Sequence, residues 1–457
     1  MATTLDDTPA TQEFNPSDHL KSIINAGSLL AGSTKSRGDD TSKTLLDVII
    51  GRLHEFNNAT TSIPNLGLDS GTIDEKSLSE LKLLTAQNSL EVLEHIQDLL
   101  REYDVDLPSD NKESNAPRVA LGTRDLGVLR TLASILFGWG TTPLLVALYP
   151  QLKPSSTLTS NLSGISGLTE DIKRMIIRST SLLWSSDIRP GTSTQSTRLF
   201  SSHITKILIT AHIVDILRAG ISIGWLPEPD KQIQQIVLEL LKILPASQAI
   251  VSLGAVNQPM RSSPETGSGP LATPSYVQKT ASVLLSQQVL RADGVSGLCA
   301  AVFGEGDEVA PLVKLERIAR VLGAVPAQMD REAYMRIIIP NIIDLLSPAK
   351  LEFQSQSAPT TYKQAAAFTL SRLLKTSKSL ALKIISPIIH ARFFPERTSQ
   401  ETPLLSDTIS ILTTIFTSTD PSPFLAQVIV GPILVPLYNL SAHLDAQRVS
   451  DPALKES

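Results

Sequence analysis

The single cysteine is the first residue to consider for chemistry. Cys299 is the only cysteine among 457 residues and lies in the apolar run GVSGLCAAVFG. A reactive cysteine needs a thiolate stabilised by a nearby cation or histidine, and no histidine is close to it in sequence. We expect an inert thiol buried in an apolar helix. One cysteine also excludes an intramolecular disulfide framework and cysteine-based zinc modules, and it suits a reducing compartment.

Patterns for metal, phosphate or acyl chemistry are incomplete. The seven histidines are scattered, and only His203 and His212 share a predicted helix, on opposite sides of it at about 100° per residue. The His-Glu pair at His54 lacks the second histidine of a zinc motif. Gly304 and Gly306 lack the lysine and third glycine of a phosphate loop, and no GxSxG is present. The sequence predicts no catalytic, cofactor-binding or metal-binding residues, and therefore no enzyme.

Two charged segments have a structural and a functional interpretation. In GTRDLGVLR, Asp125 favours a helix N-terminus, where its charge complements the helix dipole. The functional alternative is a partner-recognition corner made by Arg124, Asp125 and Arg130. The charges of 314–320 (KLERIAR) are typical of a solvated helix face, and ligand contact is the alternative.

Helical periodicity recurs along most of the chain, and alternating strand-like runs are scarce. Leucine and isoleucine residues of 76–102 fall mostly on one helical face. We predict further helices over 124–137, from Pro143 after a Gly-rich turn, and over 171–184, 201–219 and 229–245, with a loop over 151–170. The Ser-, Gly- and Pro-rich stretch 257–274 is predicted to be a flexible linker.

After this linker the sequence indicates repeated helix pairs. The pairs are 309–324 with 330–346, 361–376 with 378–393, and 404–418 with 422–440. Their second helices align on Pro340, Pro387 and Pro432, which are 47 and 45 residues apart. Armadillo and HEAT repeats have this length. We therefore predict an all-α fold, an armadillo/HEAT-like α-solenoid of stacked helix pairs, with an irregular helical bundle as the alternative.

The predicted organisation has five parts. A partly disordered N-terminal segment precedes helical repeats, the linker, a second set of repeats and a tail. Their bounds are 1–75, 76–256, 257–274, 275–444 and 445–457.

Composition restricts the partners. There are 45 Asp and Glu against 40 Lys and Arg, and this acidic excess argues against nucleic-acid binding. The stretches 131–152 and 421–444 lack charged residues and approach the length of a bilayer span. Glycine and proline interrupt both, so buried core helices are favoured over membrane segments. The acidic N-terminus does not resemble a secretory signal.

Four segments carry a family resemblance. They are RVALGTRDLGVLRTLASILFGWGTTPLL (118–145), QQVLRADGVSGLCAAVFGE (287–305), LVKLERIARVLGAVPAQMDREAYMRIIIPNIIDLL (312–346) and TYKQAAAFTLSRLLKTSKSLALKIISPIIHARF (361–393). The chain resembles a eukaryotic helical-repeat family of fungal RNA polymerase II assembly and nuclear-import factors, whose animal relatives are named for transport and Golgi organisation. The motifs are helix-packing patterns. Family members are usually longer, which suggests that this chain is a truncated form.

The resemblance implies a scaffold without an active site or cofactor. The expected partners are RNA polymerase II subunits, co-chaperones or nuclear-pore components, in the cytoplasm with shuttling to the nucleus. The alternative is a secretory-pathway factor that binds vesicle-coat or Golgi components at Golgi or ER membranes. An unrecognised enzyme is the least favoured class. The candidate contacts on the second helices are Asn341, Asp344, Lys383, His390 and Arg392.

Overall fold

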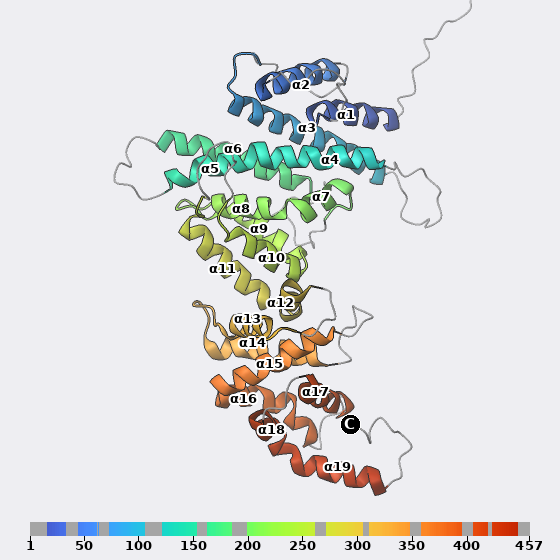
Figure 1. Ribbon diagram of the computed structural model, residues 1–457, viewed down its shortest axis with the longest axis vertical. Helices are drawn as coiled ribbons and strands as arrows, with labels where there is room; N and C mark the ends of the chain where they lie inside the picture. The colour runs from blue at the N-terminus through green and yellow to red at the C-terminus, as the bar shows by residue number, and fades with distance from the viewer. Residues whose placement is uncertain are drawn as a thin grey trace, which may run out of the picture. The chain divides into compact units, whose positions relative to one another are not determined.

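Within the residues that the structure describes, the chain is helical. The computed structural model describes residues 16–32, 44–61, 63, 73–105, 121–152, 162–184, 199–260, 271–304, 310–347, 358–394, 405–418 and 423–446. These residues contain helices and two isolated β-bridges but no strand (Figure 1). The predicted all-α class is confirmed for this part of the chain.

The chain divides into two compact units, which are described separately. Unit 1 comprises Met1–Ile243 and Val256–Gln278, and unit 2 comprises Leu244–Ala255 and Lys279–Ser457. The division falls within α10 and α11. The domain boundaries expected from sequence stay predictions, and 261–270 of the expected linker lies outside the described residues.

Unit 1 is built from consecutive amphipathic helices. They are α1 (Pro16–Leu30), α2 (Leu45–Thr60), α3 (Leu78–Val105), α4 (Thr123–Ile135), the π-helical turn η2 (Leu136–Thr141), α5 (Thr142–Gln151), α6 (Leu162–Ser181), α7 (His203–Ala211), α8 (Ile213–Gly224) and α9 (Lys231–Ile243). α3 packs against α1, α4 and η2, while α6 contacts α5 and α8, and α8 packs on α9. Helix α3 is therefore the element to which the first half of this unit is anchored.

The predicted Gly-rich turn before Pro143 is wrong, because the backbone stays helical through η2 into α5. A Cβ atom at Gly140 would lie 2.3 Å from Met175 Cε and 3.0 Å from Ala86 Cβ. Glycine is thus needed here for close approach of neighbouring helices, not for chain reversal. The single wide turn resembles the π-bulges that interrupt many α-helices.

Two further boundaries in unit 1 differ from expectation. The loop predicted over 151–170 is wrong from Leu162 onward, where α6 begins. The single helix predicted over 201–219 is two helices, α7 and α8, bent by 71°. His212 lies at the bend with a non-helical φ of −123°. Its ring stacks on Phe137 at a centroid distance of 4.8 Å, so a contact distant in sequence accompanies the break.

Unit 2 contains most of the remaining helices. They are α10 (Ala246–Val256), α11 (Ser275–Val289), α12 (Gly294–Phe303), α13 (Leu312–Gly323), α14 (Arg331–Leu346), α15 (Thr360–Thr376), α16 (Lys378–Ile388), η4 (His390–Phe393), α17 (Leu405–Ser418), α18 (Pro423–Ile429), η5 (Gly431–Ile433) and α19 (Leu434–Ala446). The helix predicted over 422–440 is wrong as a single element, because it bends by 44° between α18 and the segment that follows.

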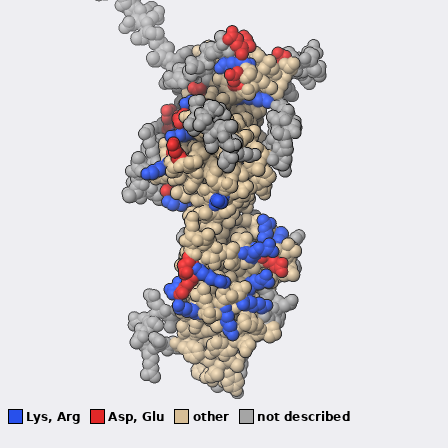
Figure 2. All heavy atoms as spheres, turned by 90° about the vertical axis from the view of Figure 1, so that its left-hand side faces the viewer, with Lys and Arg blue, Asp and Glu red and all other residues tan. Residues whose placement is uncertain are grey.

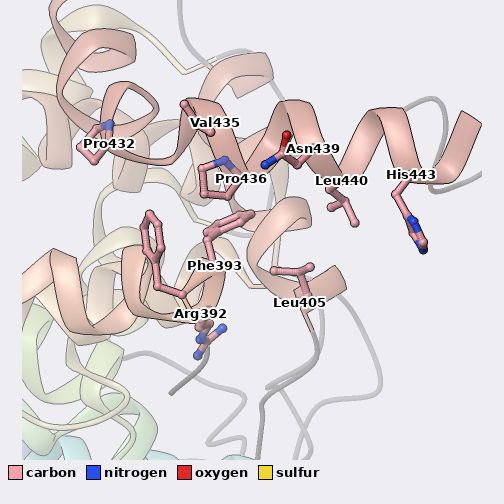
Figure 3. A pocket seen from close by; sticks show the side chains of 10 residues that line it. Arg392, Phe393, Leu405, Pro432, Val435, Pro436, Asn439, Leu440 and His443 are labelled. Carbon is pink, nitrogen blue, oxygen red and sulfur yellow. The ribbon is translucent and has the colours of Figure 1, made fainter. Parts of the chain in front are cut away.

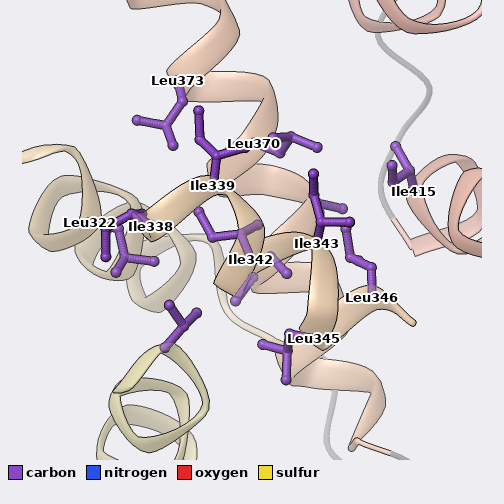
Figure 4. Packing of buried hydrophobic residues seen from close by; sticks show 14 of the residues in the cluster. Leu322, Ile338, Ile339, Ile342, Ile343, Leu345, Leu346, Leu370, Leu373 and Ile415 are labelled. Carbon is purple, nitrogen blue, oxygen red and sulfur yellow. The ribbon is translucent and has the colours of Figure 1, made fainter. Parts of the chain in front are cut away.

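Helices of unit 2 pack on the equivalent helix of the next pair. α13 packs on α15 and α15 on α17, while α14 packs on α16 and also touches α15. Aliphatic side chains fill the space between these layers, as Figure 4 shows for Ile338, Ile342 and Leu370, each fully buried. Such packing buries apolar faces that no single pair covers by itself.

The three aligned prolines lie at the same distance from the start of the second helix of their pairs. Pro340, Pro387 and Pro432 each lie nine residues after the first residue of α14, α16 and α18, which are Arg331, Lys378 and Pro423. α14 continues as a helix beyond its proline, and α16 ends one residue after it. In the third pair α18 ends at Ile429, and Pro432 is the second residue of η5. The register seen in the sequence is therefore also a register of structural elements.

Candidate functional site

The corner formed by Arg124, Asp125 and Arg130 belongs to the first turns of α4. Asp125 Oδ2 accepts a hydrogen bond from the backbone N–H of Gly122 at 2.9 Å. This contact satisfies an amide that has no helical partner, and the carboxylate charge favours the helix N-terminus. The structural interpretation of Asp125 is confirmed. Arg124 and Arg130 are exposed, so their predicted role in partner recognition stays a prediction.

Two of the predicted contacts on the second helices face inward. Asn341 Nδ2 donates to the carbonyl oxygen of Arg291 at 3.1 Å, which joins α14 to the segment after α11. His390 is 6% exposed, and its Nε2 lies 2.9 Å from the carbonyl oxygen of Ile429. A carbonyl only accepts, so Nε2 carries the proton and donates. These side chains hold elements of unit 2 together, and His390 offers no accessible surface to a partner.

Lys383 and Asp344 are exposed on α16 and α14. Lys383 Nζ lies 2.9 Å from Glu332 Oε1, which also accepts from Arg336 at 2.7 Å. Hydrogen bonds from Arg336 and Lys383 lower the pKa of the Glu332 carboxyl below its usual value. Lys383 therefore belongs to a surface ion pair that links the second helices of neighbouring pairs.

Arg392 lies beside a groove in unit 2, between η4 and α19, with a volume of about 770 Å³ (Figure 3). Its Nη1 donates to Thr408 Oγ1 at 3.0 Å, which directs the guanidinium toward α17. The lining is mostly apolar: Phe393, Phe394, Leu405, Pro432, Val435, Pro436, Asn439, Leu440 and His443 complete it. Phe394 is 53% exposed and Val435 68% exposed. The groove could receive an apolar side chain of a partner.

The groove brings Arg392 together with residues that the sequence did not single out. For the lining residues of η5 and α19, the signal in the sequence is the charge-free stretch 421–444. In the structure α19 has exposed apolar residues along it, including Leu434 and Tyr438. A large exposed apolar surface is typical of an interaction site.

Cys299 is fully buried in α12, as the sequence predicted. Burial raises the pKa of its thiol to about 12, so the thiolate does not form near neutral pH. In the described part of the chain, no three His, Cys, Asp or Glu side chains are grouped in a way that could hold a metal ion.

By length and composition, one helical stretch in the described ranges is apolar enough to cross a bilayer. This stretch is Thr123–Gln151, and 56% of its most apolar 18-residue window is buried inside the protein. The bent pairs α7–α8 and Pro423–His443 meet the same criterion if each is counted as one span.

Comparison with known proteins adds no relative. No protein-family model matches the chain, and neither a curated protein nor a solved structure matches it significantly.

Proposed function

We propose that this protein is a non-enzymatic scaffold whose helix pairs form an armadillo/HEAT-like α-solenoid. The observation that carries the proposal is the layered packing of unit 2, in which α13, α15 and α17 follow one another and α14 packs on α16. The common position of Pro340, Pro387 and Pro432 supports a repeating unit. Arrays of this kind act through extended surfaces to which each repeat contributes a few side chains.

The groove between η4 and α19 is the proposed docking point for partner proteins. Phe394 and Val435 expose apolar surface beside Arg392, and interfaces are enriched in aromatic residues and arginine. An apolar side chain seated there would lose water on both sides of the contact. That is the arrangement in which a few residues supply most of the binding energy.

The process served is inferred from the sequence resemblance alone. It favours RNA polymerase II assembly and nuclear import, with polymerase subunits, co-chaperones or nuclear-pore components as partners. A solenoid fits this role because assembly and import both require a surface that holds another protein without changing it covalently.

Affinity purification of the tagged full chain, followed by chemical cross-linking, tests the proposal. We expect recovery of polymerase, chaperone or pore components, with cross-links to unit 2. The double variant Phe394→Asp and Val435→Asp should lose them, since a carboxylate in the groove must be desolvated on binding. Both residues are more than half exposed, so the variant should fold. Val251→Asp, also exposed, is the matched control. Unchanged recovery by the groove variant contradicts the docking point, and recovery of none of these classes contradicts the scaffold.

A secretory-pathway factor attached to Golgi or ER membranes is the second candidate. The observation that favours it is the long apolar helical stretch Thr123–Gln151. Carbonate extraction of cell membranes distinguishes the two candidates. Retention in the membrane pellet supports the second, whereas complete release removes its integral-membrane form.

A further inference from the structure

Positive charge is concentrated in one part of the chain. Residues 310–394 hold 12 Lys and Arg against 5 Asp and Glu, a net charge of +7. The whole chain carries −5, so the remaining residues carry −12. An average over the chain therefore hides a strongly basic region within unit 2.

The cations lie where two helix-to-helix turns adjoin. Arg331, the first residue of α14, donates to Ser377 Oγ between α15 and α16. This contact brings the α13–α14 turn beside the α15–α16 turn. Figure 2 shows Lys and Arg gathered over this part of unit 2. We name the basic edge as six exposed cations, of which Arg317 lies in the middle of α13 and the others lie near these helix ends: Arg317, Arg320, Arg331, Arg372, Lys375 and Lys378.

Local structure accounts for only part of this charge. Arg320 and Lys375 lie in the last turns of α13 and α15, where cations favour the helix dipole. Arg331 and Lys378 are the first residues of α14 and α16, where the dipole disfavours a cation. Lys378 Nζ lies 5.6 Å from the centroid of the Phe424 ring, and this cation–π contact leaves the positive charge of the lysine without a paired carboxylate.

Two of the nearby acids have other partners. Asp330 accepts from the backbone N–H groups of Glu332 and Ala333 and so caps α14. Glu332 itself pairs with Arg336 and Lys383. Among the described residues, none of the six cations of the basic edge forms an ion pair with a carboxylate. Glu316 adjoins Arg317 in α13, but the six cations outnumber the acids around them, so the edge keeps an excess of positive charge.

We propose that the basic edge binds an acidic segment of a partner protein. The inference rests on the proposed function as a protein-binding scaffold and assigns the charge of its ligand. Arginine side chains offer a fork of N–H donors that matches a carboxylate. Several such pairs on adjacent helices would be formed at once by glutamates or aspartates spaced along an extended chain. Complementary charge of this kind speeds encounter and selects partners.

A nucleic acid fits the edge less well. Single strands are bound by successive aromatic platforms beside cations, and the ring found beside a cation of the basic edge among the described residues is that of Phe424 next to Lys378. A long duplex would need cations beyond these six to neutralise its phosphates, and the chain outside residues 310–394 has a net charge of −12. An acidic peptide places its charges only where the cations are.

Fluorescence anisotropy with the full chain tests the proposal. The probe is a labelled peptide of alternating Glu and Gly, with a Gln and Gly peptide as its neutral counterpart. We expect binding of the Glu peptide alone, weakening as salt rises from 0.05 to 0.5 M, because screening acts on exposed charges. Arg372→Glu with Lys375→Glu should weaken it by about tenfold or more, since attraction becomes repulsion.

The matched control is Lys206→Glu with Lys231→Glu, two exposed positions in unit 1 with the same change in net charge. Equal loss in both double variants would overturn the site and reduce the effect to net charge. Tighter binding of a 20-nucleotide RNA, or of phosphatidylserine vesicles, than of the Glu peptide at 0.15 M salt would overturn the ligand class. Absence of Glu-peptide binding would overturn the proposal.

Affinity purification separates failure of this inference from failure of the proposed function. If the wild-type chain recovers partners and the Arg372→Glu, Lys375→Glu variant recovers them equally, the basic edge is not their site although the scaffold stands. If the wild-type chain recovers no partner while it binds the Glu peptide, the proposed function fails and the edge remains. Loss of partners in the edge variant alone supports both.

Discussion

Contacts between two side chains join helices of unit 1 that are far apart in sequence, whereas in unit 2 the interior side chains of Asn341 and His390 bond to backbone carbonyl groups. In unit 1, fully buried Gln97 donates to the carbonyl oxygen of Leu182 at 2.7 Å and accepts from Ser202 Oγ at 2.9 Å. Arg178 on α6 pairs with Glu94 on α3. In unit 2 the side chains buried between the helices include Ile338, Ile342 and Leu370.

The difference helps to explain why the proline-aligned helix pairs occur in unit 2. A buried hydrogen bond requires one partner at one place, so each polar contact fixes a unique pairing of helices. Aliphatic residues of similar volume can replace one another at modest cost. A helix pair with an aliphatic interior can therefore recur with a different sequence. The prolines then mark equivalent positions in successive pairs.

The chain contains separate probes for the two units. All three tryptophans, Trp139, Trp184 and Trp225, belong to unit 1, whereas Cys299 belongs to unit 2. Tryptophan fluorescence therefore follows unfolding of unit 1, and alkylation of the buried thiol follows opening of unit 2. The comparison can be tested with both signals in one sample.

The largest effect is expected from Leu370→Ala in the core of unit 2. The residue is fully buried, and truncating such a leucine costs about 2–5 kcal/mol because a cavity remains. Iodoacetamide should label Cys299 faster by a corresponding factor, with the tryptophan signal little changed. Leu312→Ala, at a residue 60% exposed, should leave the labelling rate near that of the wild type. Slow labelling in both variants would show that Leu370 is not part of a packed core.

Gln97→Leu should be the next in size, and it acts on unit 1. Leucine has a similar volume but removes the hydrogen bonds of Gln97 with the Leu182 carbonyl and the Ser202 hydroxyl, at a cost of about 1–3 kcal/mol for the two. Both groups keep Thr205 as a partner. Urea unfolding followed by tryptophan fluorescence measures it. Gln232→Leu, on an exposed face of α9, is the control. An unchanged or raised midpoint for Gln97→Leu would mean that the polar contact does not stabilise unit 1.

A smaller and pH-dependent effect is expected at Asp230, whose carboxylate lies 2.7 Å from Lys173 Nζ. Burial raises the pKa of this carboxyl, but hydrogen bonds from Lys173 and the amides of Ile233 and Gln232 outweigh it, and the net pKa is lowered. The lowered pKa stabilises the fold above about pH 4, the unfolded value, and this stabilisation is lost as pH falls through the folded pKa.

Asp230→Asn keeps a capping side chain but removes the charge. It should lower the free energy of unfolding of unit 1 by about 1 kcal/mol at pH 7. The deficit should shrink as pH falls below 4 and then through the lowered folded pKa, where the wild-type carboxyl becomes protonated. Urea titrations at pH 7 and pH 3 measure it, and a deficit that stays constant between them would exclude the ion pair as its cause.

Lys383→Ala should have the smallest effect. Its ion pair with Glu332 is exposed, and such pairs contribute little to stability because water and salt screen them. Cys299 labelling should be within about twofold of the wild type. If partner recovery nevertheless falls, Lys383 contributes to binding rather than to stability, which would sharpen the division between the packed interior of unit 2 and its surface.

Sequence was most informative where local signals decide structure. The helices from 310 to 394 lie close to their predicted bounds, because apolar periodicity and end signals such as the Asp330 cap are local. The helical turn at Gly140 lies against Met175 of α6, and the break at His212 lies against Phe137 of η2. Both contacts join residues that are distant in sequence. No local pattern contains that information.

The candidate site was predictable to a lesser degree. Asn341 and His390 are polar residues on predicted second helices, yet both bond to carbonyl groups that belong to other elements. The charge of the basic edge was present in the sequence but was averaged into a net charge of −5. Surface groupings become visible only when the turns that adjoin are known.

The shared proline position also has a mechanical consequence. Proline has no N–H, so the carbonyl groups of Arg336 and Lys383 cannot receive the usual helical bond from the residue four positions later. Each of these helices is therefore softer at the same distance from its start. Because α14 packs on α16, these two missing hydrogen bonds lie in neighbouring helices. Bending of the stacked helices of unit 2 would therefore occur at equivalent positions.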